Sequence, residues 1–268
     1  MNGAYPNKTI ELLYERASCR SFGEEPIPDE TLDVVLAAAA HAATGGNLQP
    51  YSIIKVLDSE VRQRLMALCG DQPFIGQAPV SLVFCIDFRR LERWAALEKA
   101  PFSARRAFRH FWISFQDVVI CAQTVCTAAN AMGLGAVYVG TVLECLEELR
   151  DLLELPKGVF PVVMVCLGYP RGQLVPKQKL GVDVVVHDEV YREMTDEELL
   201  RAYDEKYGGQ TFEATPERVD SIARACREVH GDDYAEEFLA RVRRDGHLNT
   251  AQRVFGLNYP ADEMPRRN

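Results

Sequence analysis

Apolar and polar positions along the chain alternate between helix-like and strand-like patterns, which together predict an α+β fold. Two short runs, APVSLVFCIDF (78–88) and FPVVMVCLGYP (160–170), are continuously apolar and rich in β-branched residues, as buried strands are. Further strands are expected over 51–57 and 136–140. Helices are expected over 9–17, 31–43, 61–70, 94–132 (in two pieces) and 143–155, the last opened by a capping box from Thr141 to Glu144.

The order of these elements indicates one domain. No internal repeat and no long linker interrupts the chain, so residues 1–268 are expected to form a single domain in which helices wrap a sheet. From residue 182 the pattern predicts an extended arm and then a polar helix. A charged tail, helical in parts, extends from about residue 208.

Residues 118–143 carry no charge over 26 positions and could be mistaken for a membrane span. Polar residues such as Gln123 and Asn130 interrupt the run, and Gly133 and Gly135 break it. The segment divides better into a buried helix, a glycine turn and a short strand. We therefore expect the central helix of a soluble fold, covered by a large core or by an interface.

Composition narrows the class of protein. A formal net charge of −9 and a pI near 5.2 argue against a nucleic-acid partner, since such proteins usually present a basic face. The eight cysteines form no CxxC pair and lie mostly in apolar runs, as free thiols do in a reducing compartment. The first residues lack the apolar core of a signal peptide, so a cytoplasmic location and no membrane partner are expected.

Familiar catalytic motifs are missing. The glycines of GLGAVYVG (133–140) end a helix and lead into a strand, whereas a dinucleotide fingerprint follows a strand and opens a helix. The five histidines have no metal-ligand spacing, and no nucleophile elbow, P-loop or HExxH is present, so neither a metal site nor a protein catalytic residue is expected. This pattern favours an enzyme whose chemistry is carried by a cofactor.

Three segments could bind such a cofactor. In ERASCRSF (15–22), the spacing of Arg16 and Arg20 would place both guanidiniums on one helical face, where they suit a phosphate; an ordinary solvated helix end is the alternative. The glycine loop 42–52 carries amide side chains. In LVPKQKLG (174–181), Lys177 and Lys179 alternate onto one side of an extended loop.

The order of these motifs resembles the nitroreductase family of FMN flavoproteins. The resemblance rests on RxSxRxF near the N-terminus, a loop ending N-x-Q-P, GLGxVYxG in mid-chain, LGYP and then PKxK, over roughly residues 9–207. More narrowly, the chain is similar to the larger NADPH-dependent subgroup of oxygen-insensitive nitroreductases and FMN reductases. That resemblance implies a three-layer sandwich with a central mixed sheet wrapped by helices.

The resemblance also implies an intertwined homodimer with FMN at its interface. NADPH or NADH would give a hydride to FMN, and a nitroaromatic, quinone or flavin-type acceptor would then take it by a ping-pong mechanism. The residues that match the family's FMN contacts are Arg16, Ala17, Ser18, Arg20, Thr44, Asn47, Gln49, Gln72, Tyr138, Val139, Gly140, Thr141, Lys177 and Lys179.

The chain departs from the family pattern after residue 207. The region GGQTFEATPERVD does not align with the loop that helps the subgroup select NADPH, although Arg218 or Arg224 could serve. Two alternatives stay open. The protein could store FMN or sense redox state without efficient turnover, or it could be an interaction protein that binds no flavin.

Overall fold

The computed structural model describes residues 5–102 and 108–207. The chain divides into two compact units, of which the first runs to Val175 and the second begins at Pro176. Each is described by itself below. The expectation of a single domain with an extension from about residue 208 stays a prediction, because the tail lies outside the described residues.

The first unit is built on a four-stranded sheet. Its strands are β1 (Tyr51–Val56), β2 (Val80–Asp87), β3 (Gly135–Val139) and β4 (Val159–Gly168). Their order across the sheet is β1-β2-β4-β3, and all three pairings are antiparallel. The mixed character predicted for the sheet is limited to one isolated parallel bridge, in which Ser18 pairs with Ala136 on β3.

Helices connect and cover these strands. They are α1 (Lys8–Glu15), α2 (Asp29–Ala40), α3 (Ser59–Leu68), α4 (Pro73–Gln77), α5 (Phe88–Leu97), α6 (Phe108–Ala131) and α7 (Leu146–Leu152), with short 3-10 turns at Gly45–Asn47 and Thr141–Glu144. The helical segment expected over 94–132 does form two helices. Its first helix begins earlier than expected, directly after β2, because the carboxylate of Asp87 accepts a hydrogen bond from the backbone N–H of Arg90 and caps it.

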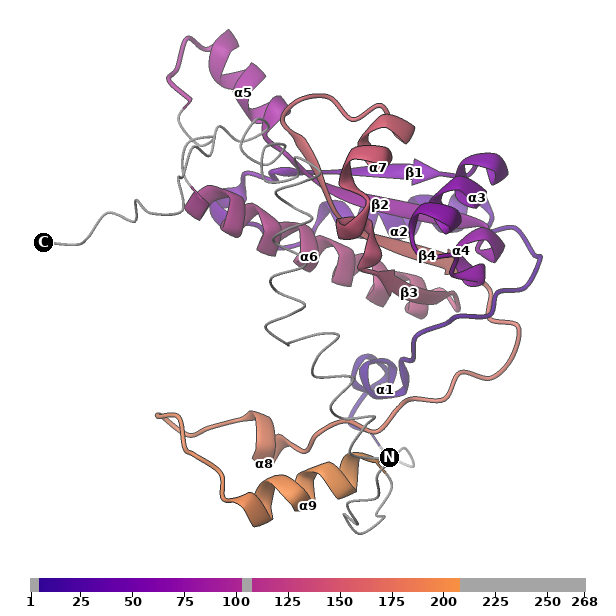
Figure 1. Ribbon diagram of the computed structural model, residues 1–268, viewed down its shortest axis with the longest axis vertical. Coiled ribbons are helices and arrows are strands. Elements are labelled where there is room, and N and C mark those ends of the chain that lie inside the picture. The colour runs from indigo at the N-terminus through magenta and orange to yellow at the C-terminus, as the bar shows by residue number, and fades with distance from the viewer. Residues whose placement is uncertain (1–4, 103–107, 208–268) are drawn as a thin grey trace, which may run out of the picture. The chain divides into compact units, whose positions relative to one another are not determined.

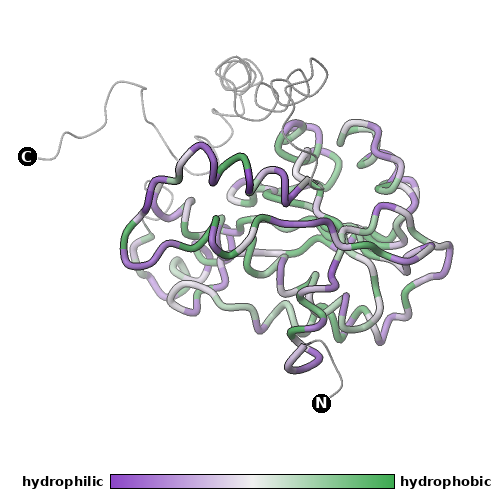
Figure 2. The backbone as a smooth tube through the Cα atoms, turned by 90° about the horizontal axis from the view of Figure 1, so that it is seen from below, coloured by the Kyte–Doolittle hydropathy of each residue, from purple (hydrophilic) through white to green (hydrophobic). Residues whose placement is uncertain are grey.

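Side chains on the two faces of the sheet belong to two separate cores. On β2, Leu82, Phe84 and Ile86 pack with α2 and α6, whereas Val83 and Cys85 pack on the opposite face with α3, α4 and α7. Both faces are covered, so β2 and β4 are buried along their whole length and read as continuous apolar runs. Hydrophobic colouring is accordingly concentrated along the central strands (Figure 2). The predicted α+β three-layer arrangement is confirmed.

Helix α6 runs the length of the sheet (Figure 1) and is apolar on two sides. Its inner side, including Val118, Ala122 and Val125, is fully buried against the sheet. Its outer side leaves Val119 and Ile120 exposed, and the helix is long and apolar enough to span a membrane, a test that core helices of soluble proteins also meet. The outer side of α6 therefore carries apolar side chains that the described part of the chain leaves exposed.

The second unit, described to residue 207, contains α8 (Val182–Val185) and α9 (Asp196–Tyr207). A capping box opens α9: the Thr195 hydroxyl accepts from the N–H of Glu198, and the Glu198 carboxylate accepts from the N–H of Thr195 at 2.9 Å. Arg192 pairs with the same carboxylate at 2.9 Å and holds its pKa below the ordinary value. The predicted extended segment and polar helix are therefore present.

Candidate functional site

Residues 16–22 form an extended segment beside β3 rather than the end of a helix. Helix α1 ends at Glu15, and Arg16 already has extended backbone angles, φ −61° and ψ 131°. The N–H of Cys19 donates to the carbonyl of Ala136 at 3.0 Å, as in a short added strand. The helical spacing proposed for Arg16 and Arg20 is therefore wrong.

The side chains of Arg16 and Arg20 nevertheless lie on the same side of the chain, for a different reason. In an extended segment, side chains alternate with a period of two. Ala17 and Cys19 are buried, whereas Arg16, Ser18 and Arg20 lie on the outer side. The two guanidiniums and the hydroxyl thus share one side of the segment, and they border the edge strand of the sheet.

The guanidinium of Arg16 contains a buried donor that lacks a hydrogen-bond acceptor within the described part of the chain. Its Nε is buried and has no hydrogen-bond partner among the described residues. The positive charge lies near Tyr138 and Cys126, where it opposes the rise in pKa that burial causes in both groups. A buried N–H without an acceptor costs about 1–3 kcal/mol, and an anionic group of a cofactor would supply the acceptor. The segment therefore fits the phosphate or ribityl part of FMN.

The end of β3 supplies the next part of the site. Tyr138 donates its hydroxyl to Gln123 Oε1 at 3.3 Å. Val139 is buried, so only its backbone could reach a ligand, while Gly140 is exposed and a Cβ added there would meet nothing within 4 Å. Because β3 is an edge strand, half of its backbone groups face away from β4. This arrangement suits the predicted backbone contacts along a flavin ring.

Thr141 and Gln72 are joined by hydrogen bonds. Gln72 Nε2 donates to the Thr141 hydroxyl at 3.2 Å and to the Cys69 carbonyl at 2.8 Å, and the Thr141 hydroxyl also lies 3.3 Å from that carbonyl. The predicted capping box from Thr141 to Glu144 is wrong: these residues form a 3-10 turn without a side-chain cap, and α7 begins only at Leu146. The Thr141 side chain instead fixes Gln72.

The loop before β1 forms a second group of predicted contacts. Thr44 donates its hydroxyl to Asp117 Oδ2 at 2.8 Å, and both carboxylate oxygens of Asp117 accept from the N–H of Gly45 at 3.1 Å. Gln49 Nε2 donates to the carbonyl of Ala40 at 3.0 Å. Thr44 and Gln49 therefore shape the loop, whereas the exposed Asn47 side chain makes no hydrogen bond with any described residue.

Three residues of this loop have left-handed backbone conformations. Gly46, Asn47 and Gln49 have φ values of 60°, 56° and 47°, in the left-handed region that side chains other than glycine rarely adopt. Such conformations persist only where surrounding contacts impose them, and they gather at ligand sites. The carboxylate of Asp117, only 4% exposed, supplies those contacts from α6.

Two residues that hold the loop in place are not identified by the sequence patterns. Asp117 stands immediately before the uncharged run 118–143, and a lone carboxylate bordering a long apolar helical run is the signal that could have identified it. Arg90 donates through NH2 to the carbonyls of Gln49 and Tyr51, at 2.5 and 2.8 Å, and so braces the loop from α5. No local sequence signal marks Arg90, because its partners are 41 and 39 residues away.

The loop and the segment of Arg16, Ser18 and Arg20 lie at opposite ends of the sheet. The loop precedes Tyr51, whose level in the sheet is that of Phe160 at the start of β4. Ser18 pairs with Ala136, which lies opposite Leu167 near the end of β4. This separation is about 23 Å along the strands, and the groups also stand at opposite edges, β1 and β3. Within one chain the loop therefore lies far from the segment of Arg16, Ser18 and Arg20.

Lys177 and Lys179 belong to the second unit. Both side chains are exposed and lie in a segment without regular secondary structure. Their part in FMN binding stays a prediction, as do the roles of Arg16, Ala17, Ser18 and Arg20 and of the other residues matched to the family. Arg218 and Arg224 lie outside the described residues.

The described part of the chain holds no group of three or more histidine, cysteine or acidic residues placed to bind a metal ion. Its seven cysteines are all free and buried. Burial raises the pKa of the Cys121 and Cys126 thiols to about 11 and that of Cys166 to about 12. These thiols behave as small apolar core residues rather than as nucleophiles.

Comparison with known proteins identifies the family. The family model described as "Nitroreductase family" matches residues 13–169. The chain is 36% identical over 198 residues to an oxygen-insensitive NADPH nitroreductase of Salmonella typhimurium, covering 74% of this chain and 80% of that protein. It is 35% identical over 206 residues to an FMN reductase [NAD(P)H] of Bacillus subtilis, covering 75% and 81%.

Solved structures of similar fold support the same family. The NADPH:FMN oxidoreductase of Vibrio harveyi, complexed with NAD+, superimposes with a TM-score of 0.72 at 28% identity, over 95% of this chain and 100% of that one. The structure described as the "hypothetical oxidoreductase YcnD" of Bacillus subtilis gives a TM-score of 0.74 at 31% identity, over 88% of this chain and 97% of that one. The matched family region covers more than half of the 268 residues. The chain therefore belongs to the nitroreductase family.

Proposed function

We propose that this chain is an FMN-dependent NAD(P)H oxidoreductase that passes a hydride from nicotinamide to flavin and then to a nitroaromatic, quinone or flavin-type acceptor. The observation that carries the proposal is the buried, unpartnered Nε of Arg16 beside the edge of β3. The similar proteins from Salmonella typhimurium and Bacillus subtilis are named for NADPH nitroreductase and FMN reductase activity, which is the same chemistry.

Each group of residues has a distinct task in this proposal. Arg16, Ser18 and Arg20 bind the phosphate and ribityl chain, joined by Lys177 and Lys179 of the second unit. Each charge-assisted contact contributes about 1.5–3 kcal/mol, so several of them hold FMN without a covalent link. The ring edge is contacted by Gln72 and by the backbone of Tyr138, Val139, Gly140 and Thr141.

A homodimer completes the site. Because the loop of Thr44, Asn47 and Gln49 lies about 23 Å along the sheet from Ser18, we place it against the flavin held by the partner subunit. The outer side of α6 supports this arrangement, since Trp112 is 54% exposed and Ile120 is 43% exposed. A second copy of the chain would cover these side chains and form the intertwined dimer.

The chain's own residues bind and orient the reactants. FMN, when bound, supplies the hydride-transfer chemistry, so no protein acid or base is required. Gln72 is held by Thr141 and Cys69, and the loop around Asn47 is held by Asp117 and Arg90, so both are positioned before any ligand arrives. We also place the protein in the cytoplasm, where its buried free thiols would stay reduced.

The visible spectrum of the purified protein, recorded before and after anaerobic addition of NADPH and then NADH, tests the proposal. A flavin spectrum that bleaches supports an oxidoreductase, and the faster donor gives the nicotinamide preference. A flavin spectrum that neither donor bleaches would replace the proposal with storage or redox sensing. A colourless protein that takes up no added FMN would leave an interaction protein.

A further inference from the structure

Two cysteines that are distant in sequence lie side by side next to Gln72. Cys69 directly follows the last residue of α3, and Cys145 stands between the 3-10 turn Thr141–Glu144 and α7. Their thiols are hydrogen-bonded to each other, and the Cys145 sulfur also lies 3.6 Å from the carbonyl oxygen of Thr141. A disulfide requires two cysteines that approach each other this closely.

The two thiols differ in acidity. The hydrogen bond from Cys145 lowers the pKa of Cys69 and outweighs the opposite effect of burial. The same bond, together with burial, raises the pKa of Cys145. For Cys121 and Cys126, in contrast, burial dominates and raises the pKa. Since the thiolate is the reactive form of cysteine, Cys69 is suited to be the nucleophile of the pair and Cys145 its resolving partner.

The pair is buried, but it lies directly beneath the surface. Cys69 is fully buried and Cys145 is 6% exposed. Their neighbours in sequence, Gly70 and Asp71 on one side and Glu144 on the other, are exposed. The elements that flank Cys145 are a four-residue turn and a seven-residue helix, and short elements of this kind open locally at low free-energy cost. A small oxidant can therefore reach the sulfurs without global unfolding.

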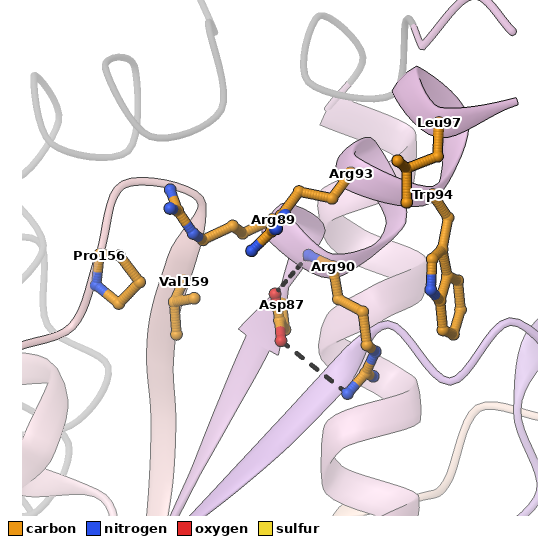
Figure 3. Close-up of a pocket in the computed structure, with 8 residues that line it drawn as sticks. All are labelled: Asp87, Arg89, Arg90, Arg93, Trp94, Leu97, Pro156 and Val159. Atoms are coloured by element: carbon orange, nitrogen blue, oxygen red, sulfur yellow. Dashed lines mark hydrogen bonds and ion pairs between the residues drawn. The ribbon is translucent and has the colours of Figure 1, made fainter. Parts of the chain in front are cut away.

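The charges around the pair favour a neutral oxidant. After the bond to Cys69 and burial, the carboxylates of Glu148 and Glu144 add to the rise in the pKa of Cys145, so they lie near its thiol. Arginines gather instead in a cavity of about 390 Å³ between α5 and the turn before β4, which neither cysteine lines (Figure 3). The carboxylates would repel an anionic disulfide such as oxidised glutathione, whereas hydrogen peroxide is small and uncharged.

The backbone of Cys69 also holds the predicted flavin contact. Its carbonyl accepts from Gln72 Nε2 at 2.8 Å and lies 3.3 Å from the Thr141 hydroxyl, to which Gln72 donates at 3.2 Å. Bonded sulfurs lie only about 2 Å apart, so a disulfide would draw Cys69 and the turn 141–145 together. Two of the three hydrogen bonds are already at the upper end of the usual range of distances, and a shift of the Cys69 carbonyl would break them.

We propose that Cys69 and Cys145 form a reversible disulfide on exposure to hydrogen peroxide, and that this bond releases Gln72 and weakens FMN binding. The Cys69 thiolate attacks one peroxide oxygen, the O–O bond breaks, and the hydroxide that leaves takes up a proton to give water. The Cys145 sulfur then attacks the resulting sulfenic acid at the sulfur, and its proton leaves with the hydroxyl as a second water. Peroxide is thus reduced to two waters while two thiols are oxidised to one disulfide. The effect on FMN rests on the proposed function.

Mass spectrometry of the full-length, flavin-loaded protein tests the disulfide. After peroxide treatment and alkylation of free thiols, cleavage after arginine and acidic residues separates Cys69 from Cys85 and Cys145 from Cys126. We expect a peptide in which Cys69 is linked to Cys145 and which dithiothreitol separates. Linkage of either residue to Cys226 or to another cysteine, or no linkage at all, would overturn the proposal.

Variants distinguish the roles of the two thiols. Cys145→Ser should stop the reaction at the sulfenic acid of Cys69, which dimedone traps as a covalent adduct. Cys121→Ala is the matched control, because its thiol belongs to the core on the opposite face of the sheet, and this variant should form the disulfide as the unaltered protein does. Dimedone labelling of Cys145 rather than Cys69 in the corresponding Cys69→Ser variant, with none in Cys145→Ser, would contradict the assigned roles.

Flavin fluorescence titration of the oxidised and reduced protein, each desalted and freed of flavin, tests the effect on binding. The dissociation constant of FMN should rise about tenfold on oxidation, as expected for the loss of one hydrogen-bonded contact, and should return after reduction. Peroxide should leave the affinity of the Cys69→Ser, Cys145→Ser double variant unchanged. A linked protein that binds FMN as tightly as the reduced protein would overturn the release of Gln72.

These outcomes are separable from failure of the proposed function. If the protein takes up no FMN, the oxidoreductase proposal fails, while the linked peptide still reports whether Cys69 and Cys145 form a disulfide. If NADPH or NADH bleaches bound flavin and no linked peptide appears, the function stands and the disulfide assignment falls.

Discussion

The hydroxyl of Thr44 donates to the buried carboxylate of Asp117 at 2.8 Å, joining residues 73 positions apart in the chain. Through this contact and the two from Gly45, α6 holds the loop in its left-handed conformations. The shape of a predicted flavin contact is therefore set from a core helix.

Asp117→Asn should weaken FMN binding about tenfold. An amide in place of the carboxylate brings an N–H group toward the N–H of Gly45, and the lost charge-assisted bonds are worth about 1.5–3 kcal/mol. Flavin fluorescence titration measures the affinity. Thr44→Ser, which keeps the hydroxyl, is the control and should bind FMN nearly as the unaltered protein does. Equal affinity for Asp117→Asn would show that the loop does not contact flavin.

Arg16→Met should separate flavin binding from stability. The methionine keeps an apolar stem but removes the buried Nε that has no partner, so the free energy of unfolding of the flavin-free protein should not fall. FMN affinity should fall between about tenfold and a hundredfold. Urea denaturation and fluorescence titration give the two quantities. A variant that loses stability but keeps its FMN affinity would show that Arg16 has a structural role and does not bind FMN.

Two glycines on either end of β3 should respond in opposite ways to alanine. A Cβ at Gly135 would lie 2.5 Å from the Cβ of Cys19, so Gly135→Ala should cost about 1–3 kcal/mol of stability. A Cβ at Gly140 meets nothing within 4 Å, so Gly140→Ala should leave the melting temperature of the flavin-free protein unchanged and weaken FMN binding alone. Thermal melts with and without FMN distinguish the two, and a destabilised Gly140→Ala would contradict the assignment.

Stability should decline between pH 9 and 11. Burial raises the pKa of Cys121 and Cys126 from 9 to about 11, so the unfolded chain releases these protons at lower pH than the folded one does. The stabilisation is complete below pH 9 and is lost as pH rises through 11, by up to about 1.4 kcal/mol per pH unit for each thiol. Urea denaturation at pH 8 and 10.5 measures the slope. Cys126→Ala should make the slope shallower, and an unchanged slope would assign the decline to other groups.

Ile120→Glu should convert the proposed dimer into monomers. The side chain is exposed on the outer side of α6, and a carboxylate there would be buried without a partner in a dimer interface. Light scattering after gel filtration reports the mass, and FMN content should fall together with it. Arg64→Glu, on α3, is the control. An unaltered protein that runs as a monomer with bound flavin would refute the shared site.

Much of the fold was predictable because apolar runs alone identify buried strands. The runs containing Leu82 and Val163 needed no partner to be recognised, since both faces of the sheet are covered. Contacts distant in sequence were not predictable. Arg16 and Arg20 were expected on one side of a helix, and they share one side of an extended segment only because Ser18 pairs with Ala136.

Two sequences that fit the capping-box pattern show that long-range contacts also decide local structure. TVLE (141–144) and TDEE (195–198) both fit the capping-box pattern, yet only the second forms one. Thr141 turns instead to Gln72 and Cys69, which come from the segment after α3. A capping sequence does not form its local hydrogen bonds when its side chain binds residues from another part of the chain.

The distance between the loop at β1 and the cationic segment at β3 has a genetic consequence. Suppose that each flavin is held by Arg16 of one subunit and Asn47 of the other. A chain altered at both positions then impairs both flavin sites of a dimer that it forms with an unaltered chain. Two chains that each carry one lesion, Arg16→Met in one and Asp117→Asn in the other, would rebuild a single intact site when they pair. Two alleles that each weaken flavin binding at a different position would therefore complement each other.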